Sequence, residues 1–173
     1  MTALRCDCGS GALVLLYGQI PSRIVELTVH SVTTTDSDTY LVLRDQPVVL
    51  PPPLAALTLE LAARSTHEQS TTSGTGNRPW LFPGARPGAH FYAGRLSTSL
   101  NKNVGIFVRP ARGAALCALA ADLPAPVLAD LLGLSITTAT RWGALAARDN
   151  AEYIAARIES PSARTDGVRS VSG

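Results

Sequence analysis

The sequence is poor in lysine. Lys102 is the only one, and every other basic residue is arginine. The 15 basic and 13 acidic residues leave a net charge of +2, so the chain lacks the strong overall positive field that attracts nucleic acid from a distance. The planar guanidinium group does suit bidentate contacts with phosphate. A preference for arginine also follows from base composition alone, however, and we give this explanation more weight.

Cysteine is scarce as well. Cys6, Cys8 and Cys117 are too few for a disulfide framework, and a single C-x-C pair lacks the second pair of ligands that a structural zinc site needs. We therefore expect reduced thiols, no bound metal and no cofactor.

Long hydrophobic runs are also missing. No apolar stretch approaches the length of about 18 residues that a membrane span requires. Residues 12–17 are apolar, but this stretch is too short for the core of a signal peptide and lacks both a basic lead-in and a small-residue cleavage site. We expect a cytoplasmic protein that does not enter a membrane.

The composition is nevertheless that of a folded domain. The chain has 173 residues and is 46% hydrophobic, which is enough for one domain with a core of its own. We place this domain at residues 1–159. A flexible loop is expected at about 65–79, where Gly, Ser and Thr predominate. Residues 160–173 show no apolar periodicity and are expected to form a disordered tail.

The upstream part of the domain predicts a small sheet flanked by helices. Residues 28–35 are β-branched, and 40–44 and 47–50 have the composition of two short strands. Helices are expected at 12–17, at 22–27, from the proline run at 51–53 to about Arg64, at 95–103 and at 151–158. The predicted fold class is mainly α, with an antiparallel sheet of two or three strands.

The stretch from Arg109 to Trp142 organises the rest of the chain. Its two arginines, Arg109 and Arg112, would share one face if a helix begins there. Helical runs are expected at 113–121 and 127–132. After Gly133, the hydroxyl-rich segment 135–138 has the composition of a helix N-cap.

In this order, the motifs resemble the catalytic domain of the tyrosine recombinases, the phage-integrase and Xer-type site-specific DNA recombinases. The resemblance covers roughly residues 12–157. It is carried by the following motifs: Leu15-Leu16-Tyr17-Gly18, the R-x-x-E-L of 23–27, a strand pair, the Leu-Phe-Pro of 81–83, the R-x-x-R of 109–112 and the segment 132–138.

The resemblance implies that Arg23 and Arg112 form the pair of arginines that grips the scissile phosphate. Two guanidinium groups would neutralise its oxygens and stabilise the charge of the transition state. Although 89 residues separate them in the sequence, we expect the two to converge on one site. Arg109 and Arg141 are further candidates for contacts with DNA.

The chemical part of the family's site is missing. Arg109 stands where the family has its first histidine, and Leu134 where the second usually is. The strand hairpin holds Arg44 but no lysine. Trp142 occupies the position of the nucleophilic tyrosine, and its ring is expected to pack against the helix carrying Arg112. Tyr153, on the last predicted helix, is expected to be a core residue. The resemblance therefore implies a DNA-binding protein of recombination or integration, without strand cleavage of its own, that works with a recombinase-like partner protein.

Two other hypotheses stay open. Residues 123–145 also fit a helix-turn-helix transcriptional regulator, with Ser135 and Thr138 facing the major groove and Arg141 the DNA backbone. Alternatively, the chain is a helical interaction domain that binds no nucleic acid. In that case Arg23 and Arg112 would pair with Glu26 and Asp130. The sequence does not determine the oligomeric state.

Overall fold

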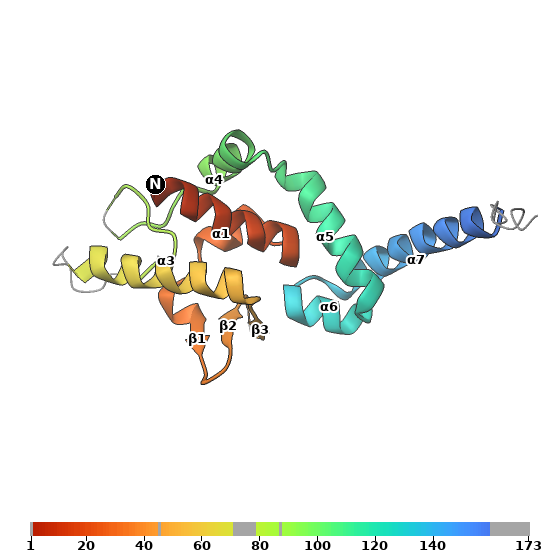
Figure 1. The fold of residues 1–173 in the computed structure, drawn as a ribbon, viewed down its shortest axis with the longest axis horizontal. Helices are drawn as coiled ribbons and strands as arrows, with labels where there is room; N and C mark the ends of the chain where they lie inside the picture. Colours follow the sequence, from red (N-terminus) through yellow and green to blue (C-terminus); the bar gives the residue numbers. More distant parts are fainter. Residues whose placement is uncertain (1, 45, 71–78, 87, 160–173) are drawn as a thin grey trace, which may run out of the picture.

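The computed structural model describes residues 2–44, 46–70, 79–86 and 88–159. Within them the protein is mainly helical and contains one small antiparallel sheet, as predicted (Figure 1). The elements are α1 (Thr2–Tyr17), α2 (Pro21–Val25), the 3-10 turn η1 (Val29–Ser31), β1 (Val32–Thr34), β2 (Thr39–Val42), β3 (Pro47–Val49), α3 (Pro52–Ser70), α4 (Ala93–Ser99), the π-turn η2 (Leu100–Val104), α5 (Val108–Asp122), α6 (Ala125–Leu132) and α7 (Ile136–Glu159).

The three strands form a meander in the order β1-β2-β3. Tyr40 of β2 pairs with Thr33 on one side and with Val49 on the other. Because successive side chains of a strand point to opposite faces, β2 alternates between buried and half-buried residues, and Leu41 is fully buried. The sheet therefore has one face toward the core, where it contacts α3.

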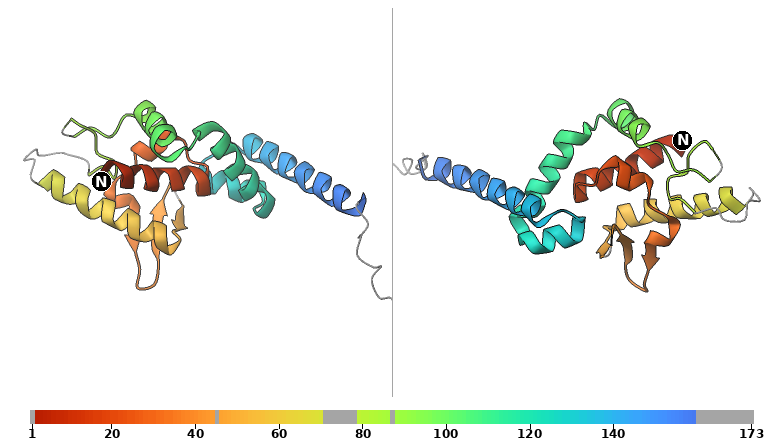
Figure 2. Two further views of the ribbon diagram at one scale, coloured as in Figure 1. Left: turned by 45° about the horizontal axis from the view of Figure 1, so that its top comes forward. Right: turned by 180° about the vertical axis from the view of Figure 1, so that it is seen from behind.

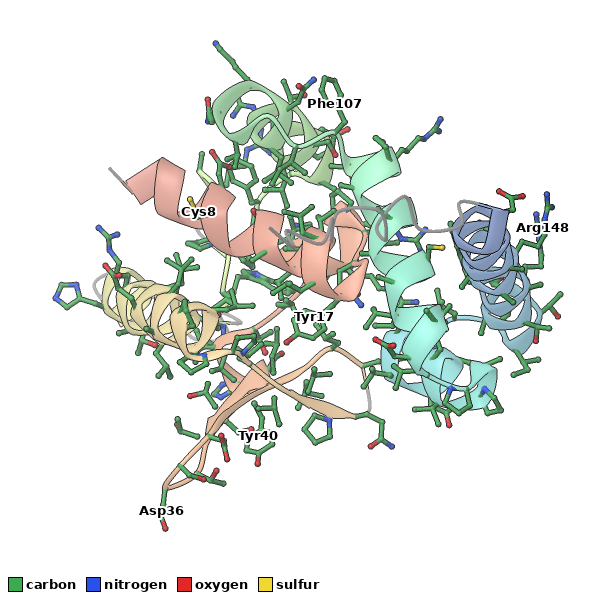
Figure 3. The ribbon with its side chains drawn as sticks, turned by 45° about the vertical axis from the view of Figure 1, so that its right-hand side comes forward. Cys8, Tyr17, Asp36, Tyr40, Phe107 and Arg148 are labelled. Carbon is green, nitrogen blue, oxygen red and sulfur yellow. The ribbon has the colours of Figure 1, made fainter. Side chains whose placement is uncertain are left out.

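Helix α1 runs through the centre of the molecule, between α3 and α5 (Figure 1). Its buried residues include Leu13 and Val14. Glycine allows its neighbours to come close, since a Cβ at Gly11 would lie only 2.7 Å from the Ile106 side chain. At its C-terminal end the buried Tyr17 hydroxyl donates a hydrogen bond of 2.9 Å to the Val49 carbonyl (Figure 3). Helix α1 is thus fixed to the sheet as well.

A buried carboxylate joins α1 to the segment that precedes α5. Asp7 is only 3% exposed, and its Oδ2 accepts hydrogen bonds of 2.8 Å from Ser99 Oγ and from Asn103 Nδ2. These two donors lie at the end of α4 and in the π-turn. Buried polar groups need such partners. The network therefore fixes α4 and the π-turn on α1.

Helices α5, α6 and α7 make up the C-terminal part of the fold. Helix α7 contacts both α5 and α6, and its far half extends away from the rest of the protein (Figure 2). Leu116, Leu128, Leu132 and Ala139 are buried in this part. Helix α6 ends at Gly133, which has a left-handed backbone with φ +61°. This conformation favours glycine.

Two predicted boundaries were wrong. Helix α1 begins at Thr2 rather than near residue 12. Helix α3 continues to Ser70 through the first part of the expected loop at 65–79, and residues 71–78 lie outside the described residues. Ser65 and Thr66 do not interrupt the helix, because their hydroxyls donate to the carbonyls of Leu81 and Ala62. The expected tail at 160–173 also lies outside the described residues.

No single helix in the described ranges is both long and apolar enough to cross a membrane. Residues 93–104 and 108–122 reach the required length and hydropathy only when taken together, and the chain bends by 87° between them.

Candidate functional site

Arginines from distant parts of the sequence converge beside Gly133. Arg23 belongs to the last turn of α2, and Arg44 follows β2. An ideal Cβ built on Gly133 would lie 2.9 Å from Nη1 of Arg23 and 3.0 Å from Nη1 of Arg44. The two guanidinium groups therefore approach one point. Only glycine leaves room for them there, so the end of α6 is part of the site.

Arg112 is fixed by the end of α1. Its Nε donates a hydrogen bond of 2.8 Å to the carbonyl oxygen of Gly18. Gly18 follows α1 and has a left-handed backbone with φ +57°. Because this bond uses only Nε, it orients the guanidinium group without occupying the two terminal nitrogens, which are the atoms that form bidentate contacts with an oxyanion.

Arg23 and Arg112 repel one another. Burial lowers the pKa of Arg112, and the positive charge of Arg23 lowers this pKa further. The charge of Arg23 thus acts on Arg112 in the folded protein, while the convergence of the two guanidinium groups on one phosphate stays a prediction. A guanidinium group stays protonated in proteins, so the proximity of the two charges destabilises the fold, and a bound anion would relieve it. Among the residues that the structure describes, no carboxylate raises the pKa of Arg112, as the hypothetical ion pair with Asp130 would do.

We call Arg23, Arg44 and Arg112 the arginine cluster. Arg44 was not predicted to belong to the site, because in the resemblance it only stands in the hairpin that lacks the family's lysine. Its signal was its position at the end of a strand in a short hairpin. That position brings the side chain to Gly133, but only once the hairpin is packed against the C-terminal helices.

Trp142 packs against the helix that carries Arg112, as predicted. Its Cη2 would be 3.7 Å from a Cβ placed on Gly113, the residue after Arg112. Gly113 therefore provides the surface on which the half-buried indole lies. This contact fixes the start of α7 against α5 and stabilises the domain by burial.

The two other predicted DNA contacts lie outside the cluster. Arg109 is exposed, and together with Arg112 it lines a cavity of about 600 Å³ beside α2. Arg141 is exposed on α7, and in the described part of the chain no contact joins it to the arginine cluster. Arg109 thus shares this cavity with Arg112, whereas Arg141 does not line it.

The segment from α6 to α7 has the layout of the helix-turn-helix hypothesis. The predicted N-cap is present, because the backbone N–H of Thr138 donates to Ser135 Oγ at 3.2 Å. The two hydroxyls of Ser135 and Thr138 also hydrogen-bond to each other at 2.8 Å. Both side chains are thus engaged in capping the helix, which leaves them less free to contact bases.

Comparison with known proteins gave no match: no protein-family model, no curated protein and no solved structure is similar to this chain. The function therefore has to be inferred from the site itself.

Proposed function

We propose that the protein binds duplex DNA by its phosphate backbone through Arg23, Arg44 and Arg112. It would act in DNA recombination or integration beside a recombinase-like partner protein, as a relative of the tyrosine recombinases that has lost strand cleavage. The observation that carries this proposal is that the guanidinium groups of Arg23 and Arg44 converge at Gly133 and that the charge of Arg23 also acts on Arg112.

The geometry supports an anion as the ligand. Like charges gathered in a partly buried site destabilise the folded protein, and an anion held between them removes this cost. Arginine pairs phosphate bidentately and is the residue most suited to planar recognition of this kind. DNA offers a phosphate at every step of both strands. A protein with a net charge of only +2 can therefore bind it through a local cluster rather than through an overall field.

The helix-turn-helix regulator is the second candidate, because α6, the turn at Gly133 and α7 follow one another in the order of such a motif and α6 contacts α7. Substitution of Ser135 and Thr138 by alanine distinguishes the regulator from the phosphate-binding protein through the preference for particular DNA sequences. A regulator would change its sequence preference, whereas a phosphate-binding protein would keep it.

Replacement of Arg112 by alanine is expected to weaken duplex binding about equally for all sequences. One lost phosphate contact should lower the slope of log affinity against log salt by about one. Fluorescence anisotropy with random-sequence duplexes at several salt concentrations measures both quantities. Arg148→Ala, on the exposed face of α7, removes the same charge elsewhere and serves as the control (Figure 3). If Arg112→Ala leaves both affinity and slope unchanged, Arg112 has a structural role only.

The protein is expected to form no covalent adduct with nicked or suicide DNA substrates at any protein concentration. Indole has no hydroxyl that could attack phosphorus. Trp142→Tyr alone should fail too, because Arg109 and Leu134 stand in the family's histidine positions and leave no acid for the departing oxygen. Denaturing gels with labelled DNA detect an adduct directly.

We do not expect Tyr17 or Tyr153 to act as the nucleophile in place of the missing tyrosine. Tyr17 donates its hydroxyl to Val49, and burial raises its pKa. Tyr153 follows Trp142 on one continuous helix. At a rise of about 1.5 Å per residue, its Cα lies roughly 16 Å beyond that of Trp142. An adduct mapped to Tyr153, or to any residue of the unmodified protein, would overturn the proposal that cleavage is lost.

A further inference from the structure

We propose that the cavity beside Phe107 receives an unpaired nucleobase of the DNA strand whose phosphate is bound by the arginine cluster. This inference rests on the proposed function and adds a preference for DNA in which a base is free to leave the helix.

The cavity lies between the start of α2, the π-turn and the start of α5. Its volume of about 600 Å³ falls within the range of about 300–1,000 Å³ that is usual for small-molecule sites. Apolar side chains make up most of the wall, which also holds two neutral polar residues, Ser97 and Asn101, and two arginines. Such a lining suits a flat, largely apolar group that carries hydrogen-bonding atoms at its edge.

Phe107 offers the surface for stacking. It lines the cavity just before α5 and is 62% exposed, beside α4 in Figure 3. A single exposed hydrophobic residue is common and needs no explanation. Here, however, the aromatic side chain shares its cavity with two arginines, Arg109 and Arg112. Aromatic rings beside a positive groove are the means by which proteins bind unpaired bases without sequence preference.

Arg112 connects the cavity with the arginine cluster. It lines the cavity, and it also feels the charge of Arg23. A phosphate held by the cluster therefore lies next to the cavity mouth, and the base of the same or the neighbouring nucleotide can enter. Arg109, three residues earlier on the same helix, would contact the adjoining phosphate. Arg109, which is not part of the arginine cluster, would therefore also bind a DNA phosphate.

The polar residues of the wall can bond the edge of a base. Ser97 donates its hydroxyl proton to the Ala93 carbonyl at 3.2 Å, so its oxygen remains an acceptor. Asn101 is exposed and carries both a donor and an acceptor. Every base has some donor or acceptor at its edge, so these residues favour a base over a purely apolar group without selecting one base.

A base inside a duplex cannot use this cavity, because its two faces are covered by its neighbours. Extrusion costs free energy, and least where the base is already unpaired. The unpaired bases at bulges, gaps and strand ends are therefore the ligands that we expect the cavity to bind. Such structures arise wherever strands are broken and exchanged, so the preference would direct this protein to DNA in the course of recombination.

The test compares three labelled duplexes of one sequence in anisotropy titrations: a fully paired duplex, one with a single bulged nucleotide, and one in which the bulged nucleotide is abasic. The unmodified protein is expected to bind the bulged base about tenfold more tightly than the abasic site, within the range that stacking of one base gives. Phe107→Ala should abolish this difference and leave the affinity for the paired duplex unchanged. Phe107→Trp should preserve it.

Tyr92→Ala is the matched control. Tyr92 is also an exposed aromatic residue, at 70%, but it lines a different hollow, on the α4 surface with Arg95 and Lys102. This variant should keep the preference for the bulged base. Equal affinity of the unmodified protein for bulged and abasic DNA would overturn the inference, as would a preference that survives Phe107→Ala. If paired duplex binding persists and depends on Arg112, the proposed function stands even when the inference fails. If no duplex is bound at all, both fall.

Discussion

A variant with Arg23, Arg44 and Arg112 all replaced by glutamine is expected to bind duplex DNA about a thousandfold more weakly than the unmodified protein at low salt. Hydrogen bonds to charged groups contribute about 1.5–3 kcal/mol each, and about 1.4 kcal/mol corresponds to a factor of ten in affinity. Neighbouring contacts do not add simply, so we take the lower value for each of the three. Glutamine is chosen because its amide can still donate to the Gly18 carbonyl that now accepts from Arg112.

The control is a second triple variant, which has the same net charge as the first but leaves the arginine cluster intact. Replacing Arg86, Lys102 and Arg148 by glutamine also removes three positive charges, so both variants change the net charge from +2 to −1. These three side chains are exposed. The control should lose only the small part of affinity that depends on overall charge. Equal losses in the two variants would mean that DNA responds to net charge and that the cluster is not its site. Circular dichroism of both variants shows whether they are folded.

Gly18→Ala is expected to lower the free energy of unfolding by about 3 kcal/mol. At φ +57° a side chain strains the backbone, which costs about 1–2 kcal/mol. The new Cβ would also lie 2.9 Å from both Cγ and Cδ2 of Leu116, which is fully buried and cannot easily move. Overpacking of this kind costs about 1–3 kcal/mol. Urea titration followed by circular dichroism measures the change.

Gly105→Ala separates the two contributions. Gly105 has a similar backbone, with φ +73°, but nothing lies within 4 Å of the position of its Cβ. It should therefore show only the backbone strain, about 1–2 kcal/mol. Because the Gly18 carbonyl orients Arg112, Gly18→Ala should also weaken DNA binding under conditions in which the variant is still folded, whereas Gly105→Ala should not. Equal destabilisation by the two substitutions would show that the contact with Leu116 is not tight.

Much of the helical architecture could be predicted from the sequence, because proline, glycine and apolar spacing act locally. The cap at Ser135 and the end of α6 at Gly133 are examples. The single helix α7 was not predicted. A separate last helix was expected at 151–158, but alanines at 144, 146 and 147 are strong helix formers, and the helix that begins at Ile136 continues through them to Glu159. The π-turn at 100–104 was expected to be ordinary helix, since its wider turn has no distinct apolar period.

The site was only partly predictable, for a different reason. Arg23 and Arg112 were paired through the family resemblance and not through any local pattern. Arg44 was missed because its place beside Gly133 depends on how a hairpin packs against helices almost 90 residues further along the chain. Likewise, the cavity at Phe107 is lined by residues from 20 to 112, so no single stretch of sequence contains it.

The central position of α1 also determines the order in which the protein can fold. The hydrogen bonds that join α1 to Ser99 and Asn103, and the adjoining Gly18 to Arg112, connect residues that are 92, 96 and 94 positions apart in the sequence. Closing such loops costs entropy before any contact compensates for it, and folds rich in distant contacts form slowly. On the ribosome α1 emerges well before α5, and its apolar side chains stay without their final neighbours until α5 has been made. A chain that stops before Arg112 therefore lacks the partner that fixes the end of α1, and we expect it to be trapped by chaperones or to aggregate rather than to fold.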